Sequence, residues 1–164
     1  QSPREPRRLE AEAIRDNALV VSNLLDETMY GPGTLKESMN RRSIYFFIKR
    51  SKLVPIMQLF DWPDSLSSMG KRSVTTTPSQ ALSFINDPNI RKMSVAFASR
   101  LKNSDDPVTL GYRIAFGRKP TKIELQTGID FIKNQTDSYS GNKEKALTNY
   151  CGALMSSNEF IYIE

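Results

Sequence analysis

The 164-residue sequence predicts an all-α protein, and three observations support this fold class. Apolar residues recur at spacings of three and four in several segments, which is typical of helices with one buried face. Helix N-terminal signals, in which Asp or Thr precedes Pro or lies three residues before Glu or Gln, recur in the second half. The alternation of apolar and polar residues that marks strands is nearly absent. We expect a single compact domain of five or six helices, with room for one short hairpin or strand around 43–50.

The first half of the chain predicts one helix over residues 7–26. A turn is expected at 30–33, where the sequence reads YGPG. Residues 43–50, inside the stretch RRSIYFFIKR, fit either a short buried strand or a buried helix, because periodicity does not separate the two over so short a run. Five consecutive apolar residues predict that both faces of this segment are buried. The apolar stripe of the first helix comprises Ala11, Ile14, Ala18, Val21 and Leu25.

Capping signals divide the second half into helices. Thr77, Asp87 and Asp106 each stand immediately before a proline, and Thr121 forms a capping box with Glu124. The last helix is predicted over about 143–157. Helical stripes follow these starts: Ile90, Met93, Phe97 and Leu101; Leu125, Ile129 and Ile132; and Leu147, Tyr150, Cys151 and Leu154.

Composition excludes several kinds of chemistry from this chain. It contains no histidine, so a Ser-His-Asp triad, a His-based zinc site and a His-ligated haem cannot be built from its own residues. Its single cysteine, Cys151, cannot form an intrachain disulfide, and its place on an apolar helix face predicts an inert buried thiol. We therefore expect no metal site and no cofactor within the chain.

The net charge of +5 comes from scattered basic pairs rather than from one basic block. Such a pattern predicts weak, salt-sensitive attraction to polyanions and no specific nucleic-acid site. No apolar run reaches the length that a membrane-spanning helix needs, so no membrane span is expected.

The only weak candidates for catalytic residues are Asp61 and Asp64 in FDWPD, with Trp62 between them. Two carboxylates can act as acid and base in glycoside hydrolysis, and an exposed indole can stack on a sugar ring. The alternative, which we favour, is that the two aspartates cap turns around Pro63 or pair with arginines such as Arg72.

Five arginines at element boundaries or in apolar surroundings predict a polar network that fixes the packing of loops. A buried arginine is rare unless it is paired, and the helix containing YRIAFGR is otherwise apolar. The arginines at the ends of RRSIYFFIKR are expected to contact carboxylates rather than phosphates. The arginines are Arg41, Arg42, Arg72, Arg113 and Arg118, and their candidate partners are Glu12, Asp16, Asp61, Asp64 and Glu124.

Several stretches, in their order and spacing, resemble one family, the planctomycete-type C-terminal domain of unknown function numbered fifteen fifty-three in the DUF series. The family has no established catalytic residues to carry over. One departure is the pair Ser65-Leu66, where the resemblance implies Arg-Glu. The matching stretches are RRLEAEAIRD at 7–16, GPG at 31–33, RRSIYFFIKRS at 41–51, FDWPD at 60–64, TTPSQALSFINDP at 76–88, YRIAFGRKPTKIE at 112–124 and ALMSSNEFIYIE at 153–164.

The resemblance implies a context rather than a chemistry. Such domains end long exported proteins, periplasmic or on the cell surface, that carry an upstream c-type cytochrome domain. Haem c would then belong to that upstream domain. Residues 1–6 would be a linker from the preceding domain, and residues 7–164 one helical domain.

We therefore expect a non-catalytic interaction or packing domain that docks against the preceding domain of its own polypeptide or a polysaccharide-associated partner. The alternatives are a carbohydrate-active or carbohydrate-binding module built on Asp61, Asp64 and Trp62, and, less favoured, nucleic-acid binding. An exposed apolar surface would distinguish the first hypothesis from the others.

Overall fold

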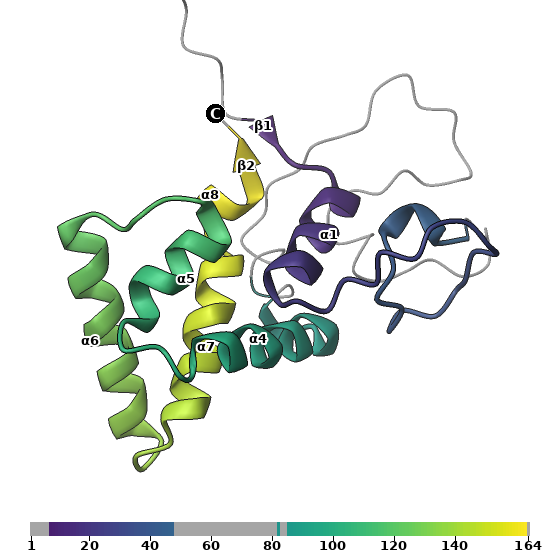
Figure 1. Ribbon diagram of the computed structural model, residues 1–164. Coiled ribbons are helices and arrows are strands. Elements are labelled where there is room, and N and C mark those ends of the chain that lie inside the picture. The colour runs from purple at the N-terminus through teal and green to yellow at the C-terminus, as the bar shows by residue number, and fades with distance from the viewer. Residues whose placement is uncertain (1–6, 48–81, 83–84, 164) are drawn as a thin grey trace, which may run out of the picture.

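The computed structural model describes residues 7–47, 82 and 85–163, and its fold is all-α, as predicted. Figure 1 shows the helices, with one two-stranded antiparallel sheet formed near the two ends of the chain. None of the helices in the described ranges is long and apolar enough to cross a bilayer. The elements are β1 (Arg7–Arg8), α1 (Ala11–Val21), the 3-10 helix η1 (Ser43–Tyr45), α4 (Pro88–Leu101), α5 (Pro107–Phe116), α6 (Lys122–Ser138), α7 (Lys143–Met155), α8 (Asn158–Ile161) and β2 (Tyr162–Ile163).

The helix starts in the second half lie where the capping signals predict them. The Asp87 carboxylate accepts hydrogen bonds from two backbone N–H groups in the first turn of α4, and Asp106 accepts one in the first turn of α5. Thr121 and Glu124 form both halves of the capping box at the start of α6. The start expected after Thr77 lies outside the described residues. These starts were predictable because a cap is a contact between residues two or three positions apart.

The first helix is shorter than the predicted range 7–26. It begins at Ala11, because Arg7 and Arg8 form a strand that pairs with Ile163 and Tyr162. The Leu9 N–H extends this contact by donating to the Ile161 carbonyl at 2.8 Å. The apolar stripe begins only at Ala11, and helical periodicity cannot reveal a strand partner near the other end of the chain.

The interpretation of 43–47 as a core segment is wrong for two of its residues, Ile44 and Phe47. Residues 43–45 form the 3-10 helix η1. Ser43 in η1 and Phe46 just after it are buried, whereas Ile44 is 82% exposed and Phe47 is 55% exposed. No strand forms over the described part of this segment, and Phe46 makes only an isolated bridge to Thr34. A five-residue apolar run predicts burial on average but does not show which neighbours are there to cover it.

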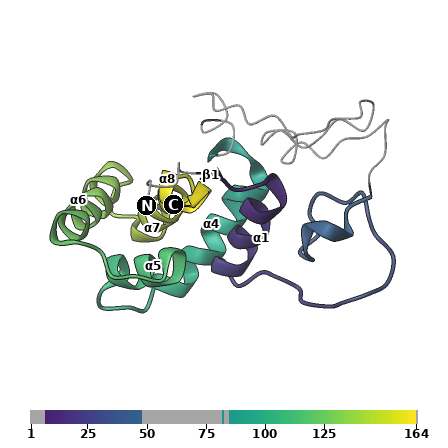
Figure 2. The same cartoon turned by 90° about the horizontal axis from the view of Figure 1, so that it is seen from above.

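The core is centred on α4 and α7, which pack against each other, with α1 on α4 and α6 on α7. Figures 1 and 2 show α6 at one side of the molecule and, at the other, the segment that follows α1. Both predicted stripes on the central pair are buried. The stripe on α6 is only partly buried, because Ile132 is buried but Ile129 is 46% exposed. Cys151 lies within the core and burial raises the pKa of its thiol, as expected for an inert cysteine.

Candidate functional site

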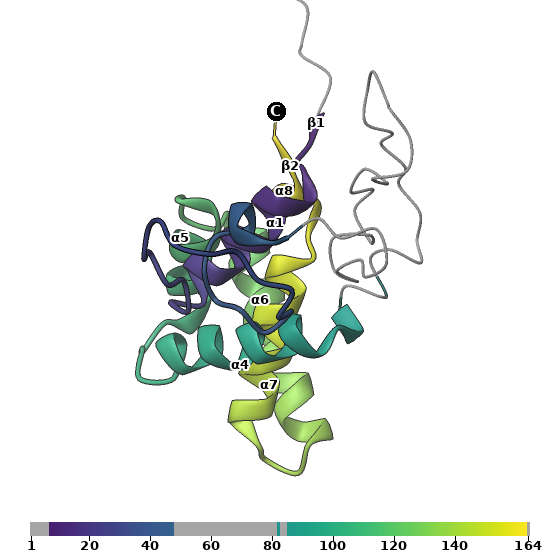
Figure 3. The same cartoon turned by 90° about the vertical axis from the view of Figure 1, so that its right-hand side faces the viewer.

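Residues 22–47, called the arm here, leave the end of α1 and fold back onto that helix without forming an α-helix themselves. Figure 3 looks onto the arm and shows it lying over α1. Isolated bridges join Asp26 to Arg41 and Thr34 to Phe46, so the two limbs of the arm run together. The arm has little regular structure. Phe46 packs in the core, Leu24, Leu25 and Met39 pack against it, and a few polar side chains make the remaining contacts.

The Arg15 side chain is the central contact between α1 and the arm. It is only 2% exposed, and its guanidinium group donates to the Met39 carbonyl, to the Arg41 carbonyl at 3.0 Å and to Ser43 Oγ at 3.1 Å. The same group lies over the Phe46 ring, 4.6 Å from the ring centroid. Burial lowers the pKa of Arg15, and the neighbouring Asp16 carboxylate opposes this change. The arginine stays charged and holds the returning limb of the arm against the helix.

Asp16, the next residue on α1, receives the hydrogen bonds that complete this junction. The Ser43 N–H donates to Asp16 Oδ1 at 2.9 Å, and the Ser43 hydroxyl donates to the same oxygen at 2.6 Å. Arg15 Nη1 lies 3.3 Å from Asp16 Oδ1, so the pair is an ion pair as well. Burying an arginine without a partner of opposite charge would destabilise the fold. Here the Asp16 carboxylate balances the charge of the Arg15 guanidinium group.

Arg41 organises the outer half of the arm through backbone carbonyl groups rather than through a carboxylate. Its guanidinium group donates to the carbonyl oxygens of Thr28, Tyr30 and Pro32, and it stacks over the Tyr45 ring at 3.5 Å from the centroid. Carbonyl oxygens therefore take the place of the carboxylates that the sequence led us to expect. One planar group with five donors fixes a turn of several residues in this way.

Tyr30 is presented to solvent in a conformation that its surroundings enforce. Its φ of 66° lies in the left-handed region, which a residue with a bulky side chain rarely adopts. Its N–H donates to Tyr45 Oη at 2.7 Å, and its carbonyl is held by Arg41. The Tyr30 side chain is nevertheless 80% exposed. Strain of this kind, about 1–3 kcal/mol, persists only where several contacts impose it, and it concentrates at binding and switch regions.

Four large apolar side chains of the arm are exposed, and we call them the exposed arm residues. They lie close in sequence to Arg41 and Ser43, whose polar groups are engaged within the chain. The exposed arm residues are Met29, Tyr30, Ile44 and Phe47.

A second polar cluster surrounds Arg118, just after α5. Its guanidinium group pairs with Glu124 of α6 and Glu159 of α8, each at 2.7 Å, and lies 5.2 Å from the centroid of the Tyr112 ring. Hydrogen bonds from Arg118, assisted by the N–H of Thr121, lower the pKa of Glu124 to about 2. The expected pair of Arg118 with Glu124 is therefore present, and Glu159 adds a partner near the end of the chain.

The remaining residues singled out from the sequence differ in their surroundings, and some of them lie outside the described ranges. Arg42 and Arg113 are exposed, and the burial that YRIAFGR suggested for Arg113 is wrong. Glu12 is half-buried on α1, where its backbone carbonyl lies 3.5 Å from Ser43 Oγ. Asp61, Trp62, Asp64 and Arg72 lie outside the described residues. In the described part of the chain, no three Cys, Asp or Glu side chains are grouped as metal ligands.

Sequence reasoning missed Arg15 and Ser43 as members of the network, although one signal was available for the arginine. Arg15 lies four residues after Ala11 and three before Ala18, so helical spacing places it on the apolar face of α1. A charged residue in that position needs a buried partner. Nothing near Ser43 in sequence indicates that it would meet Asp16.

A family model described as PSD1, protein of unknown function (DUF1553), matches residues 2–132, which is well over half of the chain. The chain belongs to the DUF1553 family. The match covers the arm and α4 to most of α6, while α7 and α8 lie beyond it. No curated protein and no solved structure matches this DUF1553 chain significantly.

Proposed function

We propose that this DUF1553 chain is a non-catalytic docking domain, and that the arm is its docking surface. The observation that carries the proposal is the exposure of four large apolar residues on an arm held in place by Arg15 and Arg41. Apolar side chains on a preorganised segment lose little conformational freedom on binding, which is what an interface anchor requires.

Docking fits the arm better than catalysis, because the polar side chains that hold the arm in place are already engaged. Arg15, Asp16 and Arg41 direct their donors and acceptors to other atoms of the chain. None of these three groups is left free to transfer a proton or to bind a reacting group. Beside exposed charges such as Glu27 and Arg42, the arm offers a partner four large apolar side chains.

A protein surface is the partner that these residue types favour over a polysaccharide. Tyr30 and Phe47 could stack on sugar rings, but Ile44 and Met29 offer only aliphatic contact. Tyr, Phe and Met are enriched in protein interfaces, where an aliphatic side chain is buried in a pocket of the partner. We assign the partner role to the preceding domain of the same polypeptide. In this proposal that polypeptide is exported and its preceding domain carries haem c.

Two arginines of the basic pairs, Arg41 and Arg118, do not support nucleic-acid binding. Arg41 donates to carbonyl oxygens and Arg118 to two carboxylates, so neither presents its donors to a phosphate backbone. The carbohydrate alternative depends on Asp61, Asp64 and Trp62, and it stays a hypothesis.

The test compares the native polypeptide with the 164-residue chain. The native polypeptide is purified from its source, weighed by mass spectrometry and examined by visible spectroscopy. Hydrogen exchange is then measured over residues 26–47 in both forms. We expect a longer polypeptide with a c-type haem spectrum, and slower exchange of the arm in it than in the 164-residue chain.

A pair of variants separates docking from general stability. In the native polypeptide, Ile44→Ser combined with Phe47→Ser should return arm exchange to the rate of the 164-residue chain. Val95→Ser, at a half-exposed position on α4, should leave arm protection unchanged. Equal exchange of the arm in both forms would refute docking through this surface. A longer polypeptide without haem c would refute only the cytochrome context.

A further inference from the structure

We propose that a groove between α5, α6 and the start of α7 binds a short peptide segment in which apolar side chains lie between a basic and an acidic one. The groove does not involve the arm, and Figures 1 and 2 place α6 and the arm on opposite sides of the molecule. The inference therefore does not rest on the proposed docking function.

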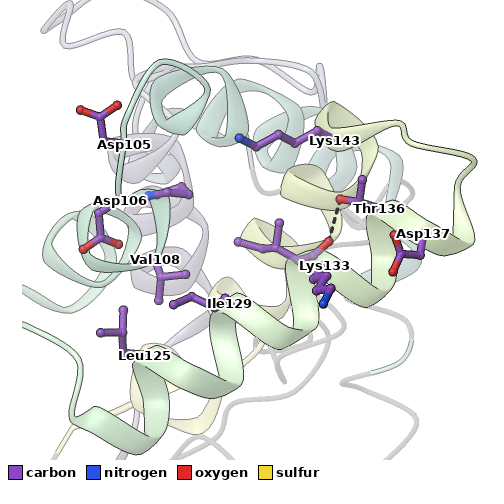
Figure 4. Close-up of a pocket in the computed structure, with 11 residues that line it drawn as sticks. Asp105, Asp106, Val108, Leu125, Ile129, Lys133, Thr136, Asp137 and Lys143 are labelled. Atoms are coloured by element: carbon purple, nitrogen blue, oxygen red, sulfur yellow. Dashed lines mark hydrogen bonds between the residues drawn. The ribbon is translucent and has the colours of Figure 1, made fainter.

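The groove has a volume of about 530 Å³, within the range of about 300–1,000 Å³ that is usual for ligand sites. Figure 4 shows its lining side chains coming from the loop before α5, from the length of α6 and from Lys143. Its floor is apolar and comprises Val108, Leu125, Ile129 and Ile132.

Ile129 is the residue that singles out this floor. The helical stripe of α6 predicts that Ile129 faces the core, yet it is 46% exposed and lines the groove. Ile132, on the same stripe, is buried. The stripe thus continues beyond the area that the other described elements cover, and an apolar ligand group would complete its burial.

Charges of opposite sign stand on different elements around this floor. Asp105 and Asp106 precede α5, whereas Lys133 and Lys143 belong to α6 and α7. Among the described residues, no ion pair joins these acidic and basic side chains. Their charges are therefore available to a ligand. A basic ligand group would lie toward the aspartates, and an acidic one toward the lysines. The negative charge of Asp137, which also lines the groove, partly offsets the positive charge of the two lysines.

The length of the groove favours a peptide over a single small molecule. Its lining on α6 runs from Leu125 to Asp137, which at the helical rise corresponds to about 18 Å. An extended peptide covers that distance with about five or six residues. An amino acid or a monosaccharide would fill only part of it.

The test uses the ¹⁵N-labelled 164-residue chain and a defined probe. The probe is a blocked hexapeptide with lysine at one end, glutamate at the other, and two leucines flanked by glycines between them. We expect saturable NMR shifts confined to residues 105–108, 125–137 and 143. Raising the salt from about 0.02 M to about 0.5 M should weaken binding, because it screens the rim charges.

Variants of the protein and of the probe test each part of the proposal. Ile129→Asn and Lys133→Glu should each weaken binding about fivefold or more. The controls Ile123→Asn, outside the groove on α6, and Lys92→Glu, on α4, should leave it unchanged. A probe with glutamine at both ends should bind more weakly than the charged probe. Absence of saturable shifts, equal binding of the two probes, or equal loss in the control variants would each overturn the proposal.

Discussion

Arg15 fixes the arm because one buried side chain satisfies several partly buried acceptors at once. Its neighbours in the fold are two backbone carbonyl groups, the Ser43 hydroxyl and the Asp16 carboxylate. If Arg15 is replaced, these acceptors lose their donor. Each buried group left unpaired lowers the free energy of unfolding by about 1–3 kcal/mol.

Replacing Arg15 by methionine should therefore destabilise the protein by about 3 kcal/mol, since the Asp16 carboxylate loses its buried partner. Denaturant unfolding at neutral pH measures this change. The matched control is Arg113→Met, because that guanidinium group is exposed on α5, and it should change stability by less than about 0.5 kcal/mol. Equal effects of the two substitutions would show that Arg15 does not hold the arm.

At the scale of the elements, helices that contain glycine approach their neighbours closely at defined positions. A Cβ atom on Gly128 of α6 would lie 2.8 Å from Val108 Cγ1 on α5 and 3.2 Å from the buried Tyr150 Oη on α7. The glycine thus sets the distance between three helices. Gly152 of α7 differs, because a Cβ atom there would meet only Ser94 Oγ, at 3.4 Å.

Two alanine substitutions test this account, since alanine favours a helix by about 1 kcal/mol over glycine at either position. Gly128→Ala should destabilise the protein by about 1–3 kcal/mol, because the new methyl group forces α5 and α6 apart. Gly152→Ala should be neutral or stabilising. Thermal unfolding of both variants measures the difference, and stabilisation by both would show that the α5–α6 contact adjusts without cost.

At the scale of the whole molecule, contacts near the two ends of the chain close the fold. β1 pairs with β2, and Arg118 joins Glu124 of α6 to Glu159 of α8. The hydrogen bonds from Arg118 lower the pKa of Glu124 from 4.5 to about 2. The folded state therefore holds the carboxylate in its charged form more strongly than the unfolded state does.

The sign of this shift predicts acid sensitivity. The stabilisation from Glu124 is complete above its ordinary pKa of 4.5 and is lost as the pH falls toward about 2. Glu124→Gln should cost about 1 kcal/mol at neutral pH, a modest value because the cluster is partly exposed. The difference from the unsubstituted protein should vanish near pH 2. Denaturant unfolding across this range measures it, and Glu27→Gln on the exposed part of the arm is the control. A difference that does not depend on pH would refute the role of the ion pair.

Much of the fold could be predicted because helix starts and stripes are local. The caps are contacts within one helical turn, so neighbouring residue types are enough to predict them. They are formed by Asp87, by Asp106 and by Thr121 with Glu124. The candidate site was predictable only in part. Asp16 and Arg41 were identified as network residues, but their partners were not, because Ser43 and the carbonyl groups of 28–32 carry no distinguishing sequence signal.

The sequence by itself determined the all-α class, the helix starts, the buried face of the central helices and the absence of histidine chemistry. These follow from residue type and from spacings of a few positions, which act before any tertiary contact forms. Only the tertiary structure decided that Arg7–Arg8 would pair with β2, that Ile44 and Phe47 would be exposed, and that Ile129 would line a groove. Burial depends on which distant element covers a residue, and a local pattern does not contain that information.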